Sequence, residues 1–358
     1  MQQEHGLIPS EPFKNKVNLF GMTCPDRIGH LAMNTELYLR RFTKNNEINK
    51  LLIYRDYPVA NRTLMNMIER KIEIAYVESE NQVLVPDGEE YLFKGNMISM
   101  SNEFWEFNNI KLQLSFIPQE IEEGKKLLKE MGVNDNKYVC IHARTPDYMK
   151  QTHDMFNYDY HNYRDCDINS YMLACDYLTT MGYYVIRMGS IVDKPLETNN
   201  PKIIDYATKY RTDLGDIFLS AHCEFFLGCT AGLWLVPMIF GIPNCTVNSV
   251  PFDFAPLLKS DLYIPKVPLE PMPFSEQLDI GIDRFESENI PLRDNTQTEI
   301  LELVNEMVFR MNNKWRPMNS DEIMQRDFKA LWKPSHRCFG FPGRIGTKFL
   351  YDNKELIR

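Results

Sequence analysis

The chain has 358 residues, with 40 basic and 49 acidic side chains and a formal net charge of -9. This length exceeds what one ordinary core accommodates and favours two domains. The negative charge excludes nucleic acid as the main partner, because binding to a phosphate backbone requires a basic surface. The longest apolar stretch, residues 233–243, is far shorter than the roughly 20 residues that a membrane-spanning helix needs.

Cysteine and histidine usage indicates a protein of a reducing compartment that holds no metal. The eight cysteines are scattered and include no Cys-x-x-Cys pair, so we expect buried free thiols. Residues 1–5 lack the basic and apolar regions of a secretory signal. The histidines, His153 and His161 among them, lack the spacing of zinc ligands. We therefore expect a protein in the cytoplasm or at the inner face of the cytoplasmic membrane.

Residues 1–134 alternate between strand and helix patterns. Strands and helices are expected, in chain order, at 16–22, 28–39, 48–54, 62–70, 72–77 and 118–132. Gly29 opens the first of these helices, and a glycine there leaves room for a ligand to approach the backbone closely. Between residues 78 and 116 the pattern breaks into short polar and aromatic pieces. We expect an α/β domain that ends near residue 134.

Residues 135–312 repeat this alternation and predict a second α/β domain. Its strands and helices are expected, in chain order, at 139–141, 168–181, 183–188, 214–222, 224–228, 233–240, 244–247 and 296–312. Units of strand, helix and strand form parallel sheets of Rossmann-like type. Asp213 is expected to cap the helix that follows it. Six prolines between residues 251 and 273 predict a surface connector and no third core.

A short apolar run, residues 139–141, leads directly into a polar cluster of His142, Arg144 and Asp147. Such a run suits a parallel strand that is covered on both faces. Ligands of open α/β sheets bind just outside the carboxyl ends of the strands, so this cluster is expected at a ligand. Arg144 is the strongest candidate, because a guanidinium matches phosphate oxygens bidentately. The alternative is a structural salt bridge between Arg144 and Asp147.

Two further clusters of small and polar residues follow strands of the second half. Their members are Arg187, Gly189, Ser190, Thr230, Ala231 and Gly232. The first three can admit a nucleoside, with an ordinary turn as the alternative. The last three open a helix, where free N–H groups and the helix dipole can receive a diphosphate; a routine N-cap is the alternative. The long loop at 150–167, rich in Tyr, Asp, Asn and His, is expected to face the same ligand.

Residues 139–148 resemble the His-x-Arg motif of GT-B fucosyltransferases, especially the bacterial α1,2 group and the α1,6 and protein-O-fucosyl groups. Residues 27–31 are similar to the glycine-containing first loop of that superfamily, and residues 213–244 to its third motif. Over most of residues 16–250, the chain resembles glycosyltransferases from bacterial surface-polysaccharide gene clusters. Thr145 stands where the fucosyl motif has a second arginine, so the resemblance implies sugar transfer without implying GDP-fucose.

The resemblance implies a GT-B fold, that is, an α/β protein whose two Rossmann-like domains face a cleft. Residues 1–134 would form the acceptor side and residues 135–312 the nucleotide-sugar side. A tail, residues 313–358, would cross back onto the amino-terminal half. Three of the aromatic residues of the tail are expected to need a surface to pack on: Trp315, Phe328 and Trp332.

The implied activity is metal-independent transfer of a sugar from a GDP- or UDP-linked donor to a glycan, lipid-linked or protein acceptor, with no cofactor. The residues implied at the nucleotide sugar are His142, Arg144, Asp147, Arg187, Gly189, Ser190, Asp213, Thr230, Ala231 and Gly232. A nucleotide-sugar epimerase of GT-B-like fold and a non-catalytic sugar-binding module are the alternative functions.

The expected chemistry follows from the charge that develops when the sugar–phosphate bond breaks. Arg144 and the N–H groups of residues 230–232 would stabilise the departing diphosphate without a metal ion. The acceptor hydroxyl needs a general base, for which Asp26, His30 and Glu36 are the candidates near the first loop. Capping and packing are the alternative roles for Asp26 and His30.

Overall fold

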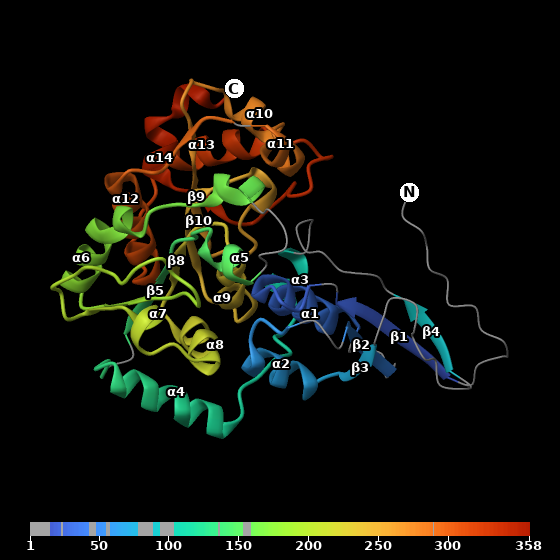
Figure 1. Cartoon of the computed structure of the whole chain (residues 1–358). Coiled ribbons are helices and arrows are strands. Elements are labelled where there is room, and N and C mark those ends of the chain that lie inside the picture. The colour runs from blue at the N-terminus through green and yellow to red at the C-terminus, as the bar shows by residue number, and fades with distance from the viewer. Residues whose placement is uncertain are drawn as a thin grey trace.

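The computed structural model describes residues 15–22, 24–42, 48–54, 58–77, 89–93, 104–134, 137–152, 159–288 and 290–358. These residues fold into an α/β protein with two parallel sheets, one from each half of the chain (Figure 1).

The first sheet is formed by β1 (Asn15–Met22), β2 (Ile48–Tyr54), β3 (Glu73–Val77) and β4 (Glu89–Phe93), in the order β3-β2-β1-β4. Its strands pair in parallel. The helices of this half are α1 (Ile28–Phe42), α2 (Arg62–Glu69), α3 (Phe104–Asn109) and α4 (Pro118–Glu130). The strands and helices predicted here are confirmed, and β4 adds a strand where the sequence pattern breaks into short pieces.

The second sheet is larger. Its strands are β5 (Tyr138–His142), β6 (Tyr184–Arg187), β7 (Ile203–Ile204), β8 (Phe226–Gly228), β9 (Asn244–Ser249), β10 (Leu262–Pro265) and β13 (Arg344–Ile345). They are ordered β13-β10-β9-β8-β5-β6-β7, with every neighbouring pair parallel. A short antiparallel pair, β11 (Val267–Pro268) with β12 (Leu292–Arg293), stands outside both sheets.

The second half also contains short and long helices. They are α5 (Asp147–Thr152), α6 (Met172–Thr180), α7 (Tyr206–Lys209), α8 (Asp213–His222), α9 (Leu235–Ile239), α10 (Phe274–Leu278), α11 (Ile282–Ser287), α12 (Gln297–Met311), α13 (Asn319–Ala330) and α14 (Thr347–Asp352). Two 3-10 helices, η1 (Asp159–Arg164) and η3 (Gly232–Trp234), contribute to the site described below.

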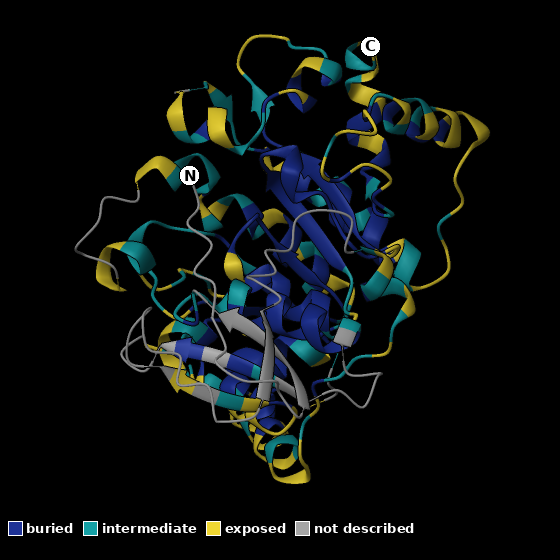
Figure 2. Ribbon diagram, turned by 90° about the vertical axis from the view of Figure 1, so that its right-hand side faces the viewer, coloured by how far each residue is buried: buried dark blue, intermediate teal, exposed yellow. Residues whose placement is uncertain are grey.

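The strand order of the second sheet reverses between β5 and β8. From β5 the chain moves outward to β6 and β7, and it then returns to place β8, β9 and β10 on the other side of β5. The carboxyl ends of β5 and β8 therefore flank the crevice in which open α/β sheets bind their ligands. Val139, Cys140 and Ile141 of β5 are fully buried, as expected for a central strand whose two faces are covered. Dark blue strands run through the middle of the molecule in Figure 2.

The segment after β9 is not the surface connector that its prolines predict. It contributes β10, which lies between β9 and β13, and Tyr263 and Ile264 of this strand are fully buried. Pro265 ends the strand beside an irregularity in its pairing with β9. Proline is tolerated at such a place, because it removes no hydrogen bond from the regular part of the ladder.

The carboxyl-terminal tail joins the second sheet, and its predicted crossing onto the amino-terminal half stays a prediction. β13 pairs in parallel with β10 at the edge of this sheet. Phe328 and Trp332 pack against Phe252, with ring centroids 6.3 and 5.8 Å apart. Trp315 lies farther out, with the guanidinium of Arg310 5.0 Å from its ring. The edge of β10 and the aromatic side chains beside it thus give the tail a surface in its own half.

Replacement of Trp332 with alanine is expected to lower the free energy of unfolding by about 3–5 kcal/mol. The side chain is 3% exposed and packs on Phe252 and Phe341. Urea titration measures the change. Trp105→Ala is the matched control, because Trp105 is 59% exposed and its truncation should cost little. Equal losses in the two variants would show that the tail does not belong to the core.

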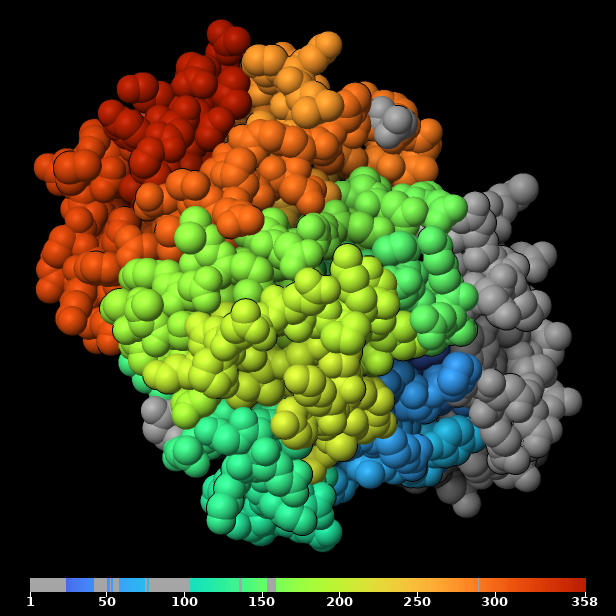
Figure 3. Space-filling model, turned by 60° about the vertical axis from the view of Figure 1, so that its left-hand side comes forward, coloured from blue at the N-terminus to red at the C-terminus, as the bar shows by residue number. Residues whose placement is uncertain are grey.

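The two halves meet along α2, α4 and α8. Nδ2 of Asn61 donates to the carbonyl oxygen of Asp213 at 2.9 Å, and N of Arg62 donates to Oδ2 of Asp213 at 2.8 Å. α4 packs so closely on α8 that a Cβ atom on Gly124 would lie 2.3 Å from the ring of Phe218. Figure 3 shows the teal surface of α4 next to the yellow surface of α8 and the blue surface of α2. The domain boundary that the sequence suggests stays a prediction.

Candidate active site

A cavity of about 200 Å³ opens at the carboxyl ends of β5 and β8, where the strand order reverses. One wall comes from the first half, through residues 27–30, Asn34 and Ala60. The opposite wall comes from the second half, through the segments that follow β5, β6 and β8. Small-molecule sites of α/β proteins commonly occupy this position.

Most of the residues predicted at the nucleotide sugar line this cavity. They are His142, Arg144, Gly189, Ser190, Thr230, Ala231 and Gly232. His30, one of the three candidates for the general base, lines the facing wall. Members of all three sequence clusters therefore meet in one place, and their individual roles stay predictions.

Two glycines allow the halves to approach each other at the cavity. A Cβ atom on Gly29 would lie 2.9 Å from Cα of Gly232 and 3.0 Å from its carbonyl oxygen. A Cβ atom on Gly232 would lie 3.2 Å from N of Gly29. Because neither position has room for a side chain, the start of α1 and the turn after β8 are held in direct backbone contact.

The polypeptide around Arg144 is fixed from two sides. Its N–H donates to Sγ of Cys229 at 3.2 Å, and its carbonyl oxygen accepts from N of Cys166 at 3.1 Å. The guanidinium forms an ion pair with Asp165, not with Asp147 as the alternative interpretation proposed. Burial raises the pKa of Asp165 to about 6 even though Arg144 opposes the shift.

Two histidines face the cavity from opposite halves. Burial lowers the pKa of His30 and the charge of Arg27 lowers it further, so the ring is neutral near pH 7. Nδ1 of His30 lies 3.4 Å from Nδ2 of Asn34. Nδ1 of His142 is buried and has no hydrogen-bond partner among the residues that the structure describes. A neutral imidazole can accept a proton, as a general base must.

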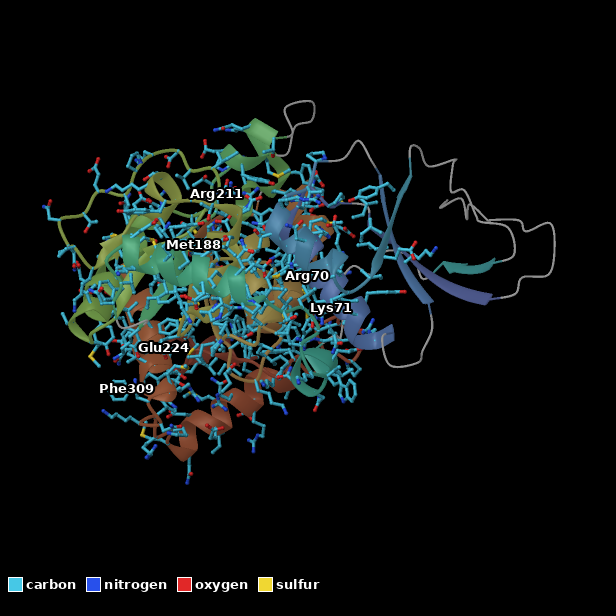
Figure 4. The ribbon with its side chains drawn as sticks, turned by 90° about the horizontal axis from the view of Figure 1, so that it is seen from below. Arg70, Lys71, Met188, Arg211, Glu224 and Phe309 are labelled. Carbon is cyan, nitrogen blue, oxygen red and sulfur yellow. The ribbon has the colours of Figure 1, made fainter. Side chains whose placement is uncertain are left out.

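Positive charge dominates the lining. The arginines that line the cavity are Arg27, Arg144, Arg164 and Arg211. Arg211, labelled in Figure 4, projects from the segment before α8 and forms ion pairs of 2.8 Å with Asp213 and with Asp216. Several guanidinium groups around one cavity suit an anionic ligand such as a diphosphate.

Glu36 does not line the cavity, so its position does not support its prediction as a base candidate. Its side chain is 0% exposed and accepts from Nε of Arg40 at 2.6 Å. It also accepts from the backbone N–H groups of Gln113 at 2.9 Å and Leu114 at 3.1 Å. Both carboxylate oxygens are thus used to join α1 to the chain that follows α3.

Arg187 and Asp147 do not line the cavity either. Arg187, 3% exposed, donates to the carbonyl oxygen of Lys194 at 2.8 Å and lies 3.5 Å from Asp205. Its side chain is engaged by residues that follow β6 and β7, so its position does not support the predicted ligand contact. Asp147 lies in the first turn of α5, outside the lining.

Two other predicted aspartates lie at the edges of the site. Thr212, not Asp213, caps α8, since the Thr212 side chain accepts from N of Gly215 at 2.9 Å. Asp213 instead links α8 to α2, as described above, so its predicted role at the nucleotide is not supported by its position. The carbonyl oxygen of Asp26 accepts from the hydroxyl of Tyr148 at 2.8 Å, beside the lining residue Arg27.

The helix predicted at 233–240 is split into the 3-10 turn η3 and the short helix α9, with Pro237 inside it. So short a helix carries a small dipole. The hydroxyl of Thr230 donates to the carbonyl oxygen of Val250 at 2.9 Å and holds the turn in place. The positive charge that attracts a bound anion must therefore come chiefly from the arginines. The dipole at the helix start, which the sequence suggested for residues 230–232, contributes less.

Sequence reasoning missed several lining residues. They include Tyr148, His161, Arg164, Trp234 and Phe254. For two of them, His161 and Arg164, the expectation of a ligand-facing loop at 150–167 was a signal, because both lie in η1 of this loop. His153 lies outside the described residues.

No group of three or more His, Cys, Asp or Glu side chains in the described part of the chain is placed to hold a metal ion. Asp165 and Asp167, two residues apart, are engaged by Arg144 and by the backbone and side-chain N–H groups of Asn169. Among the helices within the described ranges, none combines the length and the apolar character needed to cross a membrane.

Neither a protein-family model nor a curated protein sequence matches the chain. Solved structures do. The ADP-heptose LPS heptosyltransferase II of E. coli is 11% identical, with a TM-score of 0.50 over 83% of this chain and 99% of that one. A glycosyl transferase family 9 protein of Veillonella parvula is 10% identical, with a TM-score of 0.48 over 83% and 98%.

The iron-containing dodecameric glycosyltransferase TibC of enterotoxigenic E. coli is 12% identical, with a TM-score of 0.44 over 84% of this chain and 77% of that one. At such identities only the fold is shared, and the heptosyltransferase II likeness carries that conclusion. The predicted GT-B fold class, mixed α/β with a large parallel sheet, is confirmed. The narrower resemblance to His-x-Arg fucosyltransferases stays a prediction.

Proposed function

We propose that the protein is a glycosyltransferase that moves a sugar from a nucleotide-diphosphate sugar, GDP- or UDP-linked, to a glycan, lipid-linked or protein acceptor. The observation that carries the proposal is the two-sided cavity. Its second-half wall holds Arg144 and the small residues 230–232, and its first-half wall holds His30. A donor on one wall and an acceptor on the other is the arrangement that a two-substrate transfer requires. We place the reaction in surface glycan synthesis, in the cytoplasm or at the inner face of the membrane.

The chemistry assigned to each wall follows from charge. When the bond between the sugar and the β-phosphate breaks, its electrons go to the phosphate oxygen, and Arg144 stabilises the negative charge. The ion pair of Arg144 with Asp165 holds the guanidinium at the cavity before the donor arrives. His30, neutral near pH 7, accepts the proton of the attacking acceptor hydroxyl.

A thermal-shift screen against GDP-, UDP-, CMP- and dTDP-sugars tests this proposal and names the donor. A diphosphate-linked sugar should raise the melting temperature, because it binds only the folded chain. Transfer to an added acceptor should then be detectable by mass spectrometry. Conversion of the donor without an acceptor would favour an epimerase, and a shift with free sugars but none with nucleotides would favour a sugar-binding module.

Transfer should proceed unchanged in EDTA, because guanidinium groups supply the positive charge that a cation provides in other transferases. The initial rate is measured in the presence of EDTA and again after Mg²⁺ or Mn²⁺ is added back. A metal-dependent transferase assayed in parallel confirms that the chelator acts. A rate that vanishes in EDTA and returns with metal would overturn metal-independent transfer.

A further inference from the structure

Arg164 occupies a central place in the cavity that the sequence did not single out. It is the last residue of η1 and lines the cavity. Its guanidinium carbon lies 5.7 Å from the ring centroids of Phe254 and of Tyr163. Tyr163 in turn stacks on Phe285 of α11 with centroids 5.1 Å apart. Aromatic rings therefore hold the guanidinium in position and leave its N–H groups to a polar partner.

The described residues supply no such partner. Among the described residues, Arg164 forms no ion pair with a carboxylate, and its buried Nε has no hydrogen-bond partner. The charge of Glu286 raises the pKa of Arg164, but the Glu286 carboxylate itself lies 3.4 Å from Nδ1 of His161. A partly buried cation that has no carboxylate in contact is unfavourable, and an anion bound in the cavity would compensate it.

Arg164 also lies near both reacting walls. Burial lowers its pKa and the charge of Arg144 lowers it further, which places the two guanidinium groups within electrostatic reach of each other. Its charge also contributes, after burial and Arg27, to the lowered pKa of His30. Arg164 thus lines the same cavity as Arg144 and His30, and its charge acts on both side chains.

We propose that Arg164 binds the diphosphate of the donor together with Arg144 and restricts donors to nucleoside diphosphate sugars, as against sugars linked through one phosphate. This inference rests on the proposed function, since it takes a nucleotide sugar as the ligand. Two guanidinium groups match the two phosphates of a diphosphate, and the second of them, Arg164, forms no ion pair with a described residue. A monophosphate offers only one phosphate group to the two guanidinium groups.

Isothermal titration of the full chain with GDP, UDP, GMP and UMP tests the proposal. In R164Q the affinity for the preferred nucleoside diphosphate should fall about tenfold to a hundredfold, the effect of one charge-assisted hydrogen-bonding group. The affinity for the matching monophosphate should change much less. R70Q is the control, because Arg70 pairs with Glu120 at 3.0 Å on α2, away from the cavity, and should bind as wild type does.

A stability measurement separates ligand binding from a structural role. Because Arg164 has no ion-pair partner among the described residues when ligand is absent, R164M should melt no lower than the wild type when ligand-free, yet it should lose most of the shift caused by nucleoside diphosphate. Wild-type diphosphate affinity in R164Q, an equal loss for monophosphate and diphosphate, or a ligand-free R164M that melts well below the wild type would each overturn the role of Arg164. A wild-type chain that binds neither nucleoside diphosphate would instead contradict the proposed function.

Discussion

Replacement of Arg144 with alanine should lower kcat/KM for sugar transfer on the order of 10²- to 10³-fold, the usual loss when one charge-stabilising donor is removed from a transition state. Arg144 follows the central strand β5 at the point where the sheet reverses, and its side chain is 10% exposed. The same substitution should weaken the binding of the nucleoside diphosphate, because in the proposed function the side chain contacts the phosphate of the bound donor as well.

The fold should survive this substitution even though Asp165 loses its ion-pair partner. Burial already raises the pKa of Asp165 to about 6 with Arg144 beside it, so without Arg144 the carboxyl takes up a proton more readily and tolerates its position. The double variant Arg144→Ala, Asp165→Asn should match the wild type in stability and still lack activity. Arg70→Ala, on the surface of α2, is the control for loss of an arginine. Full donor affinity in Arg144→Ala would refute the phosphate assignment.

Replacement of His30 with glutamine should lower kcat about 10²- to 10⁴-fold, the range for loss of a general base, with little change in donor affinity. The split between kcat and binding follows from the position of His30 on the wall opposite Arg144. Asp26→Asn is the informative comparison, since Asp26 is the other surviving base candidate. A larger loss in Asp26→Asn than in His30→Gln would transfer the role of base to Asp26.

The pH dependence of the wild-type enzyme gives a second check on His30. A base works in its deprotonated form, and burial together with Arg27 lowers the pKa of His30 below its usual value of 6.5. Activity should therefore persist as the pH falls through 6.5 and decline only at lower pH. A profile of kcat/KM whose acid limb is centred above pH 6.5 would contradict this assignment.

The sequence was a good guide wherever a local pattern decides the structure. The apolar run 139–141 is long enough to mark a buried strand, and the polar residues after it had to emerge at a strand end. The switch point itself was not predictable, because strand order depends on pairings between segments far apart in the chain. The sequence indicates that the backbone at Gly29 can be approached closely, but only the fold shows that the residue brought there is Gly232.

The site predictions that the positions of the side chains do not support share one physical origin. Glu36 and Arg187 have the residue types of a site, but their partners at Gln113 and Asp205 are brought to them by the fold. A titratable side chain near a motif is therefore a weak indicator of a functional site until the direction in which the side chain points is known. Arg164 illustrates the converse, because it lies in an irregular loop where no periodic pattern assigns a side chain to the cavity.

A crystal structure of the protein with the nucleoside diphosphate that gives the largest thermal shift tests the central claim most directly. We expect the diphosphate to lie in the cavity at the ends of β5 and β8, with phosphate oxygens within hydrogen-bond distance of Arg144 and next to residues 230–232. A nucleotide bound elsewhere, with Arg144 still paired to Asp165 and the cavity unchanged, would contradict it.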